Sequence, residues 1–420
     1  MKKQPGQRLR VAIVIDDFYP ASGGIARSVQ TQINELVRLG HDVTLIAPKH
    51  SLQAPENCAT IVVPSLYIPG TPAYMCILQY SRRIAVRIST QAQFDVVHSQ
   101  TERGALILAA RLAKLQHIPH LHTFHANLAG THETNPFASF WGSMAYLLLI
   151  NPSIAAVSKK RFSDDVIIPK ASSDATSFFA RFDWHSLATI ASRVDAYTTP
   201  ALFMKRRIDE CSQGFGAHGH IVPTGVNPLF SSAVLAAKRS RTDRTVRFLC
   251  VSRLSKEKRV DAALRAFVTA DIPNSQLDIV GSGDQLGTLS KLAGTRDNIF
   301  FHDHMSNMDE LAKLYVNADA FIMPSYRFDT QAITLSEAAV AGLPIVYCDD
   351  RLDVGVNSDN SLLATDPGPE ALATCLTALN SPEVRKEKAS ASMRIAKQLQ
   401  PDFTVERYLE LYRQLIGSKH

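Results

Sequence analysis

Short runs of consecutive apolar residues alternate along the chain with segments whose apolar positions recur every three or four residues. Val11–Ile15 is a continuous apolar run, and Ile25, Val29, Ile33 and Leu36 after it share one helical face. Continuous apolar strands separated by amphipathic helices are typical of parallel sheets with helices on both faces. The pattern therefore predicts an α/β fold with doubly wound, Rossmann-like parallel sheets.

The chain has 420 residues, which is long enough for two such domains with separate cores. The stretch SSAVLAAKRSRTDR after Phe230 is polar, basic and poor in strand signals. Composition of this kind is typical of a boundary between domains. We therefore predict one domain over residues 1–235 and a second over residues 236–400.

Charge and cysteine usage limit the classes of partner and compartment. The net charge is +6, and the excess falls within residues 1–230, which favours an anionic lipid, a phosphorylated acceptor or nucleic acid as partner. We find no aromatic-interleaved RNA motif or zinc-finger spacing, so nucleic acid is not expected. The six cysteines form no C-x-x-C pair, and the basic N-terminus precedes only a strand-length apolar run. We expect reduced thiols, no signal peptide, no membrane-spanning helix and a cytoplasmic protein, peripheral on the inner face of the membrane.

Arg82, Arg83 and Arg87 recur at helical spacing beside Ile84 and Val86. A basic amphipathic helix of this kind can lie on an anionic membrane. A solvated helix face has the same composition, and both interpretations stay open.

Polar residues follow several predicted strands. The strand Phe321–Met323 leads into a loop with Asp329 and then a helix with Glu337, and the strand before Arg253 leads to Lys258. A helix N-terminus presents unpaired N–H groups and partial positive charge, and an Arg–Lys pair suits a diphosphate. These loops predict an anion or polyol site in the second domain.

The first domain offers glycines and histidines. Gly23 and Gly24 precede a helix, but the G-x-G-x-x-G fingerprint is absent. His98 and His125 stand at strand ends, where ligands gather in parallel sheets. The histidines of residues 117–132 lack a recognised metal-ligand spacing, so loop or core roles are favoured. The run IAAVS (154–158) predicts a further strand.

The text PSYRFDTQAITLSEAAVAGLPIV resembles the E-x7-E region of retaining family-4 glycosyltransferases of GT-B fold, with Asp329 replacing the first Glu and Ala332 replacing a Gly. The segments SRLSKEKR, IVGSG, PHLHTFH and VPTGVNPLF resemble other motifs of this family and occur in the family's order. The resemblance covers most of the chain. It implies two Rossmann-like domains facing a cleft, with residues 401–420 as a helix that crosses back to the first domain.

The resemblance also implies a reaction, in which a hexose moves from a UDP- or GDP-linked sugar to an acceptor hydroxyl with retained configuration. Glu337 would hold the ribose, Arg253 and Lys258 the diphosphate, and Asp329 the sugar hydroxyls. His125 would contact the sugar near the reacting carbon. Further donor contacts would come from Gly23, Gly24, Gly281, Gly283, Met305, Thr330, Gln331, Ala332 and Ile333.

Bacterial glycolipid-forming members, such as diacylglycerol glucosyltransferases and phosphatidylinositol mannosyltransferases, resemble the chain most. They imply a membrane glycerolipid acceptor. A soluble or polysaccharide acceptor, a non-catalytic sugar-nucleotide-binding relative and a sugar-nucleotide epimerase are the alternatives. No Asp-x-Asp occurs, which argues against a metal-dependent GT-A enzyme, so neither a metal nor another cofactor is expected.

Overall fold

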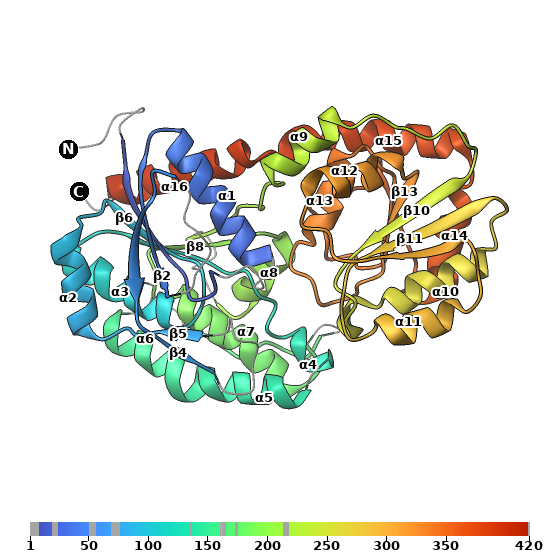
Figure 1. The fold of residues 1–420 in the computed structure, drawn as a ribbon. Coiled ribbons are helices and arrows are strands. Elements are labelled where there is room, and N and C mark those ends of the chain that lie inside the picture. Colours follow the sequence, from blue (N-terminus) through green and yellow to red (C-terminus); the bar gives the residue numbers. More distant parts are fainter. Residues whose placement is uncertain are drawn as a thin grey trace. The chain divides into compact units, whose positions relative to one another are not determined.

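The computed structural model describes residues 8–18, 24–49, 56–68, 76–134, 136–159, 161, 165–172, 175–212 and 218–418 (Figure 1). Contacts divide the chain into unit 1, Met1–Pro223 with Pro401–His420, and unit 2, Thr224–Gln400. The division falls before α9 (Pro228–Ala236), whereas the sequence placed the boundary between residues 235 and 236, at the end of this helix. Helix α9 belongs to unit 2 because Phe230 packs edge-on against Tyr315 in the core of that unit.

Unit 1 contains a parallel sheet whose strand order, within the described residues, is β3-β2-β1-β6-β7-β8-β9. Its strands are β1 (Arg10–Val14), β2 (Asp42–Pro48), β3 (Ala59–Val63), β6 (Val96–Ser99), β7 (His120–Thr123), β8 (Ala196–Thr199) and β9 (Gly219–Ile221). The hairpin β4 (Ser65–Tyr67) and β5 (Cys76–Leu78) is antiparallel and separate. The order reverses between β1 and β6, which is the arrangement predicted for a doubly wound fold.

Alternate residues of β1 enter two different cores, as strand geometry requires. Val11 and Ile13 face α1 (Gly24–Arg38) and α16 (Pro401–Ser418), whereas Ala12 and Val14 face α2 (Arg82–Gln91) and α3 (Gly104–Gln116). The other helices among the described residues of unit 1 are α4 (Thr131–Thr134), α5 (Pro136–Ala145), the π-helical η2 (Tyr146–Ile150), α6 (Asn151–Val157), α7 (Phe178–Ala191) and α8 (Leu202–Glu210). Helices thus cover both faces of the sheet (Figure 1).

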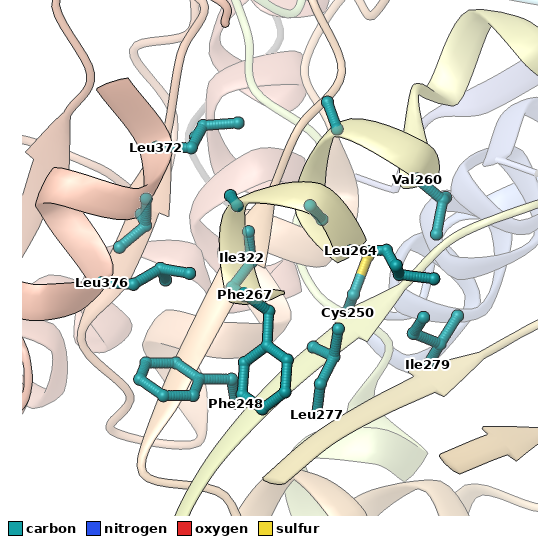
Figure 2. Close-up of a cluster of buried hydrophobic side chains, with 14 of the residues drawn as sticks. Phe248, Cys250, Val260, Leu264, Phe267, Leu277, Ile279, Ile322, Leu372 and Leu376 are labelled. Atoms are coloured by element: carbon teal, nitrogen blue, oxygen red, sulfur yellow. The ribbon is translucent and has the colours of Figure 1, made fainter. Parts of the chain in front are cut away.

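Unit 2 repeats the arrangement with a parallel sheet of order β12-β11-β10-β13-β14-β15. Its strands are β10 (Val246–Val251), β11 (Ser275–Val280), β12 (Ile299–His302), β13 (Ala320–Met323), β14 (Ile345–Tyr347) and β15 (Ser361–Leu363). Its helices, besides α9, are η4 (Lys256–Lys258), α10 (Val260–Ala270), α11 (Leu286–Ala293), α12 (Met308–Asn317), α13 (Ile333–Val340), α14 (Pro369–Ala378), α15 (Pro382–Ala396) and η5 (Lys397–Leu399). Figure 2 shows one core of the unit, in which Phe248 and Leu277 of the sheet meet Leu264 and Phe267 of α10.

The predicted fold class, two doubly wound parallel-sheet domains, is confirmed, and one local prediction is wrong. IAAVS was expected to form a strand, but residues 154–157 end α6, and α5, η2 and α6 form one continuous helical segment. A short apolar run does not distinguish a buried strand from a buried helix. Here the two alanines and the uncharged residues before them continue a helix.

Candidate functional sites in the two units

In unit 2 the strand order reverses between β10 and β13, which lie side by side and run parallel. The chain leaves β10 towards β11 and β12 on one side, and leaves β13 towards β14 and β15 on the other. The loops after the two strands therefore diverge at the carboxyl edge of the sheet, where such folds bind ligands. The predicted residues Arg253, Lys258 and Asp329 all lie in these two loops.

Lys258 and Asp329 form an ion pair between the two loops. Each side chain is 13% exposed, so water screens the pair only partly. The second carboxylate oxygen, Oδ2, accepts a hydrogen bond from Ser325 Oγ at 2.5 Å, and Lys258 Nζ lies 5.2 Å from the centre of the Phe328 ring. The structure thus joins the residue predicted for the diphosphate to the residue predicted for the sugar.

The loop that carries Asp329 is fixed at both ends. The Arg327 N–H donates to Asp349 Oδ2 at 2.7 Å. Gln331 is bound twice to one backbone, since Nε2 donates to Thr224 O at 2.8 Å and Oε1 accepts from Thr224 N at 2.7 Å. The side chain of Gln331 is therefore engaged in holding the loop.

Helix α13 begins directly after Ala332, which has a left-handed backbone with φ 54° and forms no side-chain cap. The first turn of α13, with Ile333 at its start, consequently lacks the usual side-chain acceptor for its N–H groups. Thr330, half-buried, precedes this turn in the loop. One turn into the helix, Glu337 Oε2 accepts a hydrogen bond from Tyr315 Oη at 2.9 Å, and burial beside that carboxylate raises the pKa of Tyr315.

Arg253 is exposed and lies 3.4 Å from Glu257 Oε1, so water screens this ion pair at the guanidinium. Gly281 and Gly283 lie under the same loop. A Cβ on Gly281, whose φ is +147°, would come within 1.9 Å of Ser252 O, and one on Gly283 within 2.2 Å of Leu254 O. The two glycines let the turn after β11 pack against the loop of Arg253.

Met305, half-buried, follows β12 and packs against the core of unit 2. Beside it, His302 Nε2 bonds Asp278 Oδ1 at 2.8 Å. The described residues contain no group of three or more His, Cys, Asp or Glu side chains arranged to hold a metal ion.

In unit 1 the strand order reverses between β1 and β6. Gly24 is the first residue of α1, after β1, and Gly23 lies outside the described residues. His125 follows β7, is half-buried, and bonds Gln100 Oε1 through Nε2 at 2.8 Å. Burial lowers the pKa of His125 to about 4, so the imidazole is neutral at pH 7, and Nε2–H donates to the amide oxygen.

Gln100 connects His125 to the C-terminal helix. Its Nε2 donates to Gln32 Oε1 at 2.9 Å, and Gln32 Nε2 donates to Tyr412 Oη at 3.1 Å. The Tyr412 hydroxyl also lies 2.8 Å from His98 Nδ1, and His98 Nε2 lies 2.6 Å from Thr123 Oγ1. His98 is therefore buried in a polar network that orients His125.

A buried carboxylate cluster at the same edge of the sheet was missed from the sequence. Asp16 accepts bonds from Leu78 N and Thr101 Oγ1, each at 2.7 Å, and Arg103 pairs with Asp17. Glu102 is buried, its Oε1 has no hydrogen-bond partner, and burial raises its pKa to about 7. The available signal was position, since IDD and QTER directly follow β1 and β6.

The remaining histidines and the basic helix have ordinary surroundings. His120 and His122 each lie 2.8 Å from Ser99 Oγ, and His132 Nε2 lies 2.9 Å from Asp183 Oδ2. On α2, Arg82, Arg83 and Arg87 are all exposed. In the part of the chain that the structure describes, one helical segment, Ser139–Val157, is long and apolar enough by length and composition to cross a membrane. No such segment was predicted from the sequence, because it contains no uninterrupted run of about 18 apolar residues.

Two family models match the chain in succession. Residues 22–230 match the model described as Glycosyltransferase Family 4, and residues 235–394 match Glycosyl transferases group 1. The first match lies largely in unit 1 and the second in unit 2.

Curated relatives carry glycolipid names. The chain is 24% identical to an alpha-monoglucosyldiacylglycerol synthase of Streptococcus pneumoniae over 354 residues (80% of this chain, 70% of the relative). It is 24% identical to the enzyme of the same name from Acholeplasma laidlawii over 404 residues (90% and 89%). It is 23% identical to a GDP-mannose-dependent alpha-(1-6)-phosphatidylinositol monomannoside mannosyltransferase of Mycolicibacterium smegmatis over 350 residues (80% and 79%).

Among solved structures, a glycosyltransferase from Rickettsia africae matches with a TM-score of 0.68 and 14% identity, over 98% of this chain and 99% of that one. The likeness extends over both units and shows the same fold. With the two family models, it confirms the resemblance found in the sequence. The chain belongs to the family-4 glycosyltransferases of GT-B fold and is a hexosyltransferase.

Proposed function

We propose that the protein transfers a hexose from a nucleotide-diphospho-sugar to a hydroxyl of a membrane glycerolipid, with retention of anomeric configuration. The observation that carries the proposal is the Lys258–Asp329 pair, which sits where the strand order of unit 2 reverses and just before the uncapped start of α13. The lipid acceptor is supported by the similarity to the two alpha-monoglucosyldiacylglycerol synthases.

In this proposal unit 2 binds the donor. The diphosphate carries negative charge, so it is stabilised by the ammonium of Lys258, the exposed guanidinium of Arg253 and the N-terminal amides of α13 at Ile333. Developing charge on the leaving diphosphate is stabilised by these same groups once the donor is bound. Glu337 holds the ribose hydroxyls, and Tyr315 fixes the carboxylate through its 2.9 Å bond.

Asp329 holds the sugar hydroxyls. Donor binding must therefore alter the contacts that its carboxylate makes in the structure. Both carboxylate oxygens already have partners, Lys258 and Ser325. A sugar hydroxyl therefore either shares an oxygen with one of them or displaces it. Because Lys258 also serves the diphosphate, donor binding would move the ammonium from the carboxylate towards the phosphates.

Unit 1 binds the acceptor and carries His125. The neutral imidazole donates from Nε2 to Gln100, which identifies His125 as a hydrogen-bonding group and not as a cation at pH 7. Gln100 acts through His125 and is a positioning residue. We assign Gly281 and Gly283 a packing role under Arg253, and Met305 a place beside the nucleobase.

The test is lipid glycosylation without added metal. The protein is incubated with UDP-glucose or GDP-mannose and mixed micelles containing diacylglycerol or phosphatidylinositol, and the extracted lipids are analysed by mass spectrometry. We expect a hexosylated lipid from one donor, at least a hundredfold less with Glu337→Ala, and unchanged yield with Glu310→Ala, an exposed glutamate of α12. A product found only with a soluble sugar acceptor would contradict the lipid assignment, and a free epimerised sugar would contradict transfer.

A further inference from the structure

The helical segment from Pro136 to Val157 contains no charged residue, although only one of its sides is covered by unit 1. On the covered side, Tyr146, Ile150 and Ile154 join the core that contains α7. Ser143 on the same side donates from Oγ to Asp183 Oδ1 at 2.7 Å. These contacts explain the apolar residues on the covered side of the segment, called the inner stripe. They do not explain those on the opposite side, called the outer stripe.

The outer stripe is apolar and exposed. Phe137 is 75% exposed, Trp141 59%, Leu148 67% and Leu149 56%. Residues four apart lie on one side of a helix, so Phe137 and Trp141 adjoin, and their ring centres are 6.4 Å apart. A helix face that is merely solvated carries polar or charged side chains, and this one carries none.

The exposed apolar surface continues onto α7. The rings of Phe140 and Phe179 pack edge to face, with their centres 4.9 Å apart. The ring centre of Phe179 lies 5.6 Å from that of Phe178, which is 53% exposed. We call Phe137, Trp141, Leu148, Leu149 and Phe178 the outer apolar patch. Exposed apolar side chains that adjoin one another on the surface of a domain indicate a site of interaction.

Cations border the patch at α7. The guanidinium carbon of Arg181 lies 6.0 Å from the centre of the Phe178 ring, and its Nη1 donates to Pro169 O at 3.4 Å. Pro169 adjoins Ile168, which is 38% exposed, and Lys170, which is exposed. The nearby carboxylate of Asp183 is buried against His132 and Ser143 and does not offset these charges at the surface.

We propose that the outer apolar patch lies in the headgroup–acyl boundary of an anionic bilayer, with the helical segment 136–157 parallel to the membrane plane. Aromatic side chains at the boundary, leucines below it and cations at its rim are the features of an interfacial helix. The inner stripe is packed on unit 1, so the segment lies on the bilayer and does not span it. The choice of a bilayer as occupant rests on the proposed function, whose acceptor is a membrane lipid.

This surface differs from the basic helix α2 considered from the sequence. On α2 the exposed arginines accompany one exposed large apolar residue, Val86, at 42%. Helix α2 packs on α3, and α3 packs on α6, so α3 separates the two surfaces. Arginines alone attract anionic lipid without inserting, whereas the outer apolar patch buries apolar area.

Trp141 provides the test, since the other tryptophan of the chain, Trp184, is 1% exposed. The full-length protein is mixed with phosphatidylcholine–phosphatidylglycerol vesicles whose acyl chains are brominated. We expect a blue shift and quenching of the Trp141 emission, both absent in Trp141→Phe. Flotation affinity should fall at least tenfold in Trp141→Glu and Leu148→Glu. The matched control Leu235→Glu, at an 87% exposed leucine of unit 2, should float with the affinity of the wild type.

Three outcomes would overturn the assignment. Vesicle binding that persists in Trp141→Glu but is lost when Arg82, Arg83 and Arg87 are replaced by glutamate would place the membrane surface on α2. A concentration-dependent dimer that Trp141→Glu dissociates, with no vesicle binding, would make a second copy the occupant. Vesicle binding without Trp141 quenching would exclude insertion here.

The proposed function is tested by assays that do not depend on membrane binding. Nucleotide binding and transfer to a short-chain, detergent-dispersed diacylglycerol do not need the patch. Both should persist within twofold in Leu148→Glu. If they persist while flotation of wild type fails, only the membrane surface is wrong; if wild type binds no nucleotide, the proposed function is wrong whatever the vesicles show.

Discussion

Ala332, which replaces a glycine of the resembling family, and Arg259 adopt left-handed backbone conformations, with φ of 54° and 51°. A side chain in this region costs of the order of 1 kcal/mol relative to glycine. Arg259 offsets its cost by donating from Nη2 to Pro367 O at 2.6 Å and from Nη1 to Pro324 O at 3.2 Å. Ala332 has no side-chain polar group with which to do so.

We therefore predict that Ala332→Gly stabilises unit 2 by about 0.5–1 kcal/mol, measured by urea unfolding. Ala338→Gly in the buried interior of α13 is the control and should destabilise by about 1 kcal/mol or more. Destabilisation by Ala332→Gly as large as in the control would show that no strain resides at this position.

Glu102 gives a second prediction at the residue scale, on pH. Its pKa is about 7 in the folded protein and near 4.5 in the unfolded chain, because burial penalises the carboxylate. Between these values the folded state holds the extra proton, so stability falls as pH rises from 5 to 8. Glu102→Gln should remove roughly 1–3 kcal/mol of that fall, seen as a smaller pH slope of the unfolding free energy. Equal slopes for wild type and variant would refute the buried, protonated carboxyl.

Among the elements, the loops after β10 and β13 show what strand order contributes. The sequence predicted that Arg253, Lys258 and Asp329 follow strand ends, and the parallel sheet puts them at one edge. It could not predict that Lys258 pairs with Asp329, or that Gln331 binds Thr224, since both depend on contacts between distant segments. The prediction of a strand at residues 154–157 was also wrong, because a short apolar run does not distinguish a buried strand from a buried helix.

The Lys258–Asp329 pair should fasten these loops. We predict a coupling energy of about 1–2 kcal/mol from a double-mutant cycle with Lys258→Met and Asp329→Asn, measured by chemical denaturation without nucleotide. The comparison is the pair Arg253 and Glu257 of the same loop, in which the arginine side chain is 64% exposed, and its coupling should be below about 0.5 kcal/mol. Equal coupling in both cycles would mean that burial adds nothing to the first pair.

At the scale of the molecule, the C-terminal helix belongs to the fold of the N-terminal unit. Tyr408 and Tyr412 of α16 are buried in the core that contains α1 and β1. The amphipathic pattern of residues 401–420 predicted a helix, and the resemblance supplied its partner. The hydrogen bonds of Tyr412 with Gln32 and His98 could not be predicted, because they join residues more than 300 positions apart.

Tyr412→Phe should destabilise unit 1 by about 1–3 kcal/mol, because it leaves Gln32 Nε2 and His98 Nδ1 with fewer partners in a buried site. It should also lower transfer activity by loosening Gln100 and His125. Tyr408→Phe, whose hydroxyl lies 3.4 Å from Thr123 Oγ1, is the matched control with a smaller expected loss. Thermal unfolding and transfer kinetics measure the two effects, and identical losses in both variants would argue against a special role for the Tyr412 network.

The central claim is that unit 2 holds a nucleotide-diphospho-sugar with Glu337 on its ribose. Isothermal titration of UDP-glucose and GDP-mannose into metal-free protein tests it most directly. We predict saturable binding of one of them by wild type and by Glu310→Gln, and at least tenfold weaker binding by Glu337→Gln. Failure of wild type to bind either nucleotide sugar, or equal affinity in Glu337→Gln, would contradict the claim.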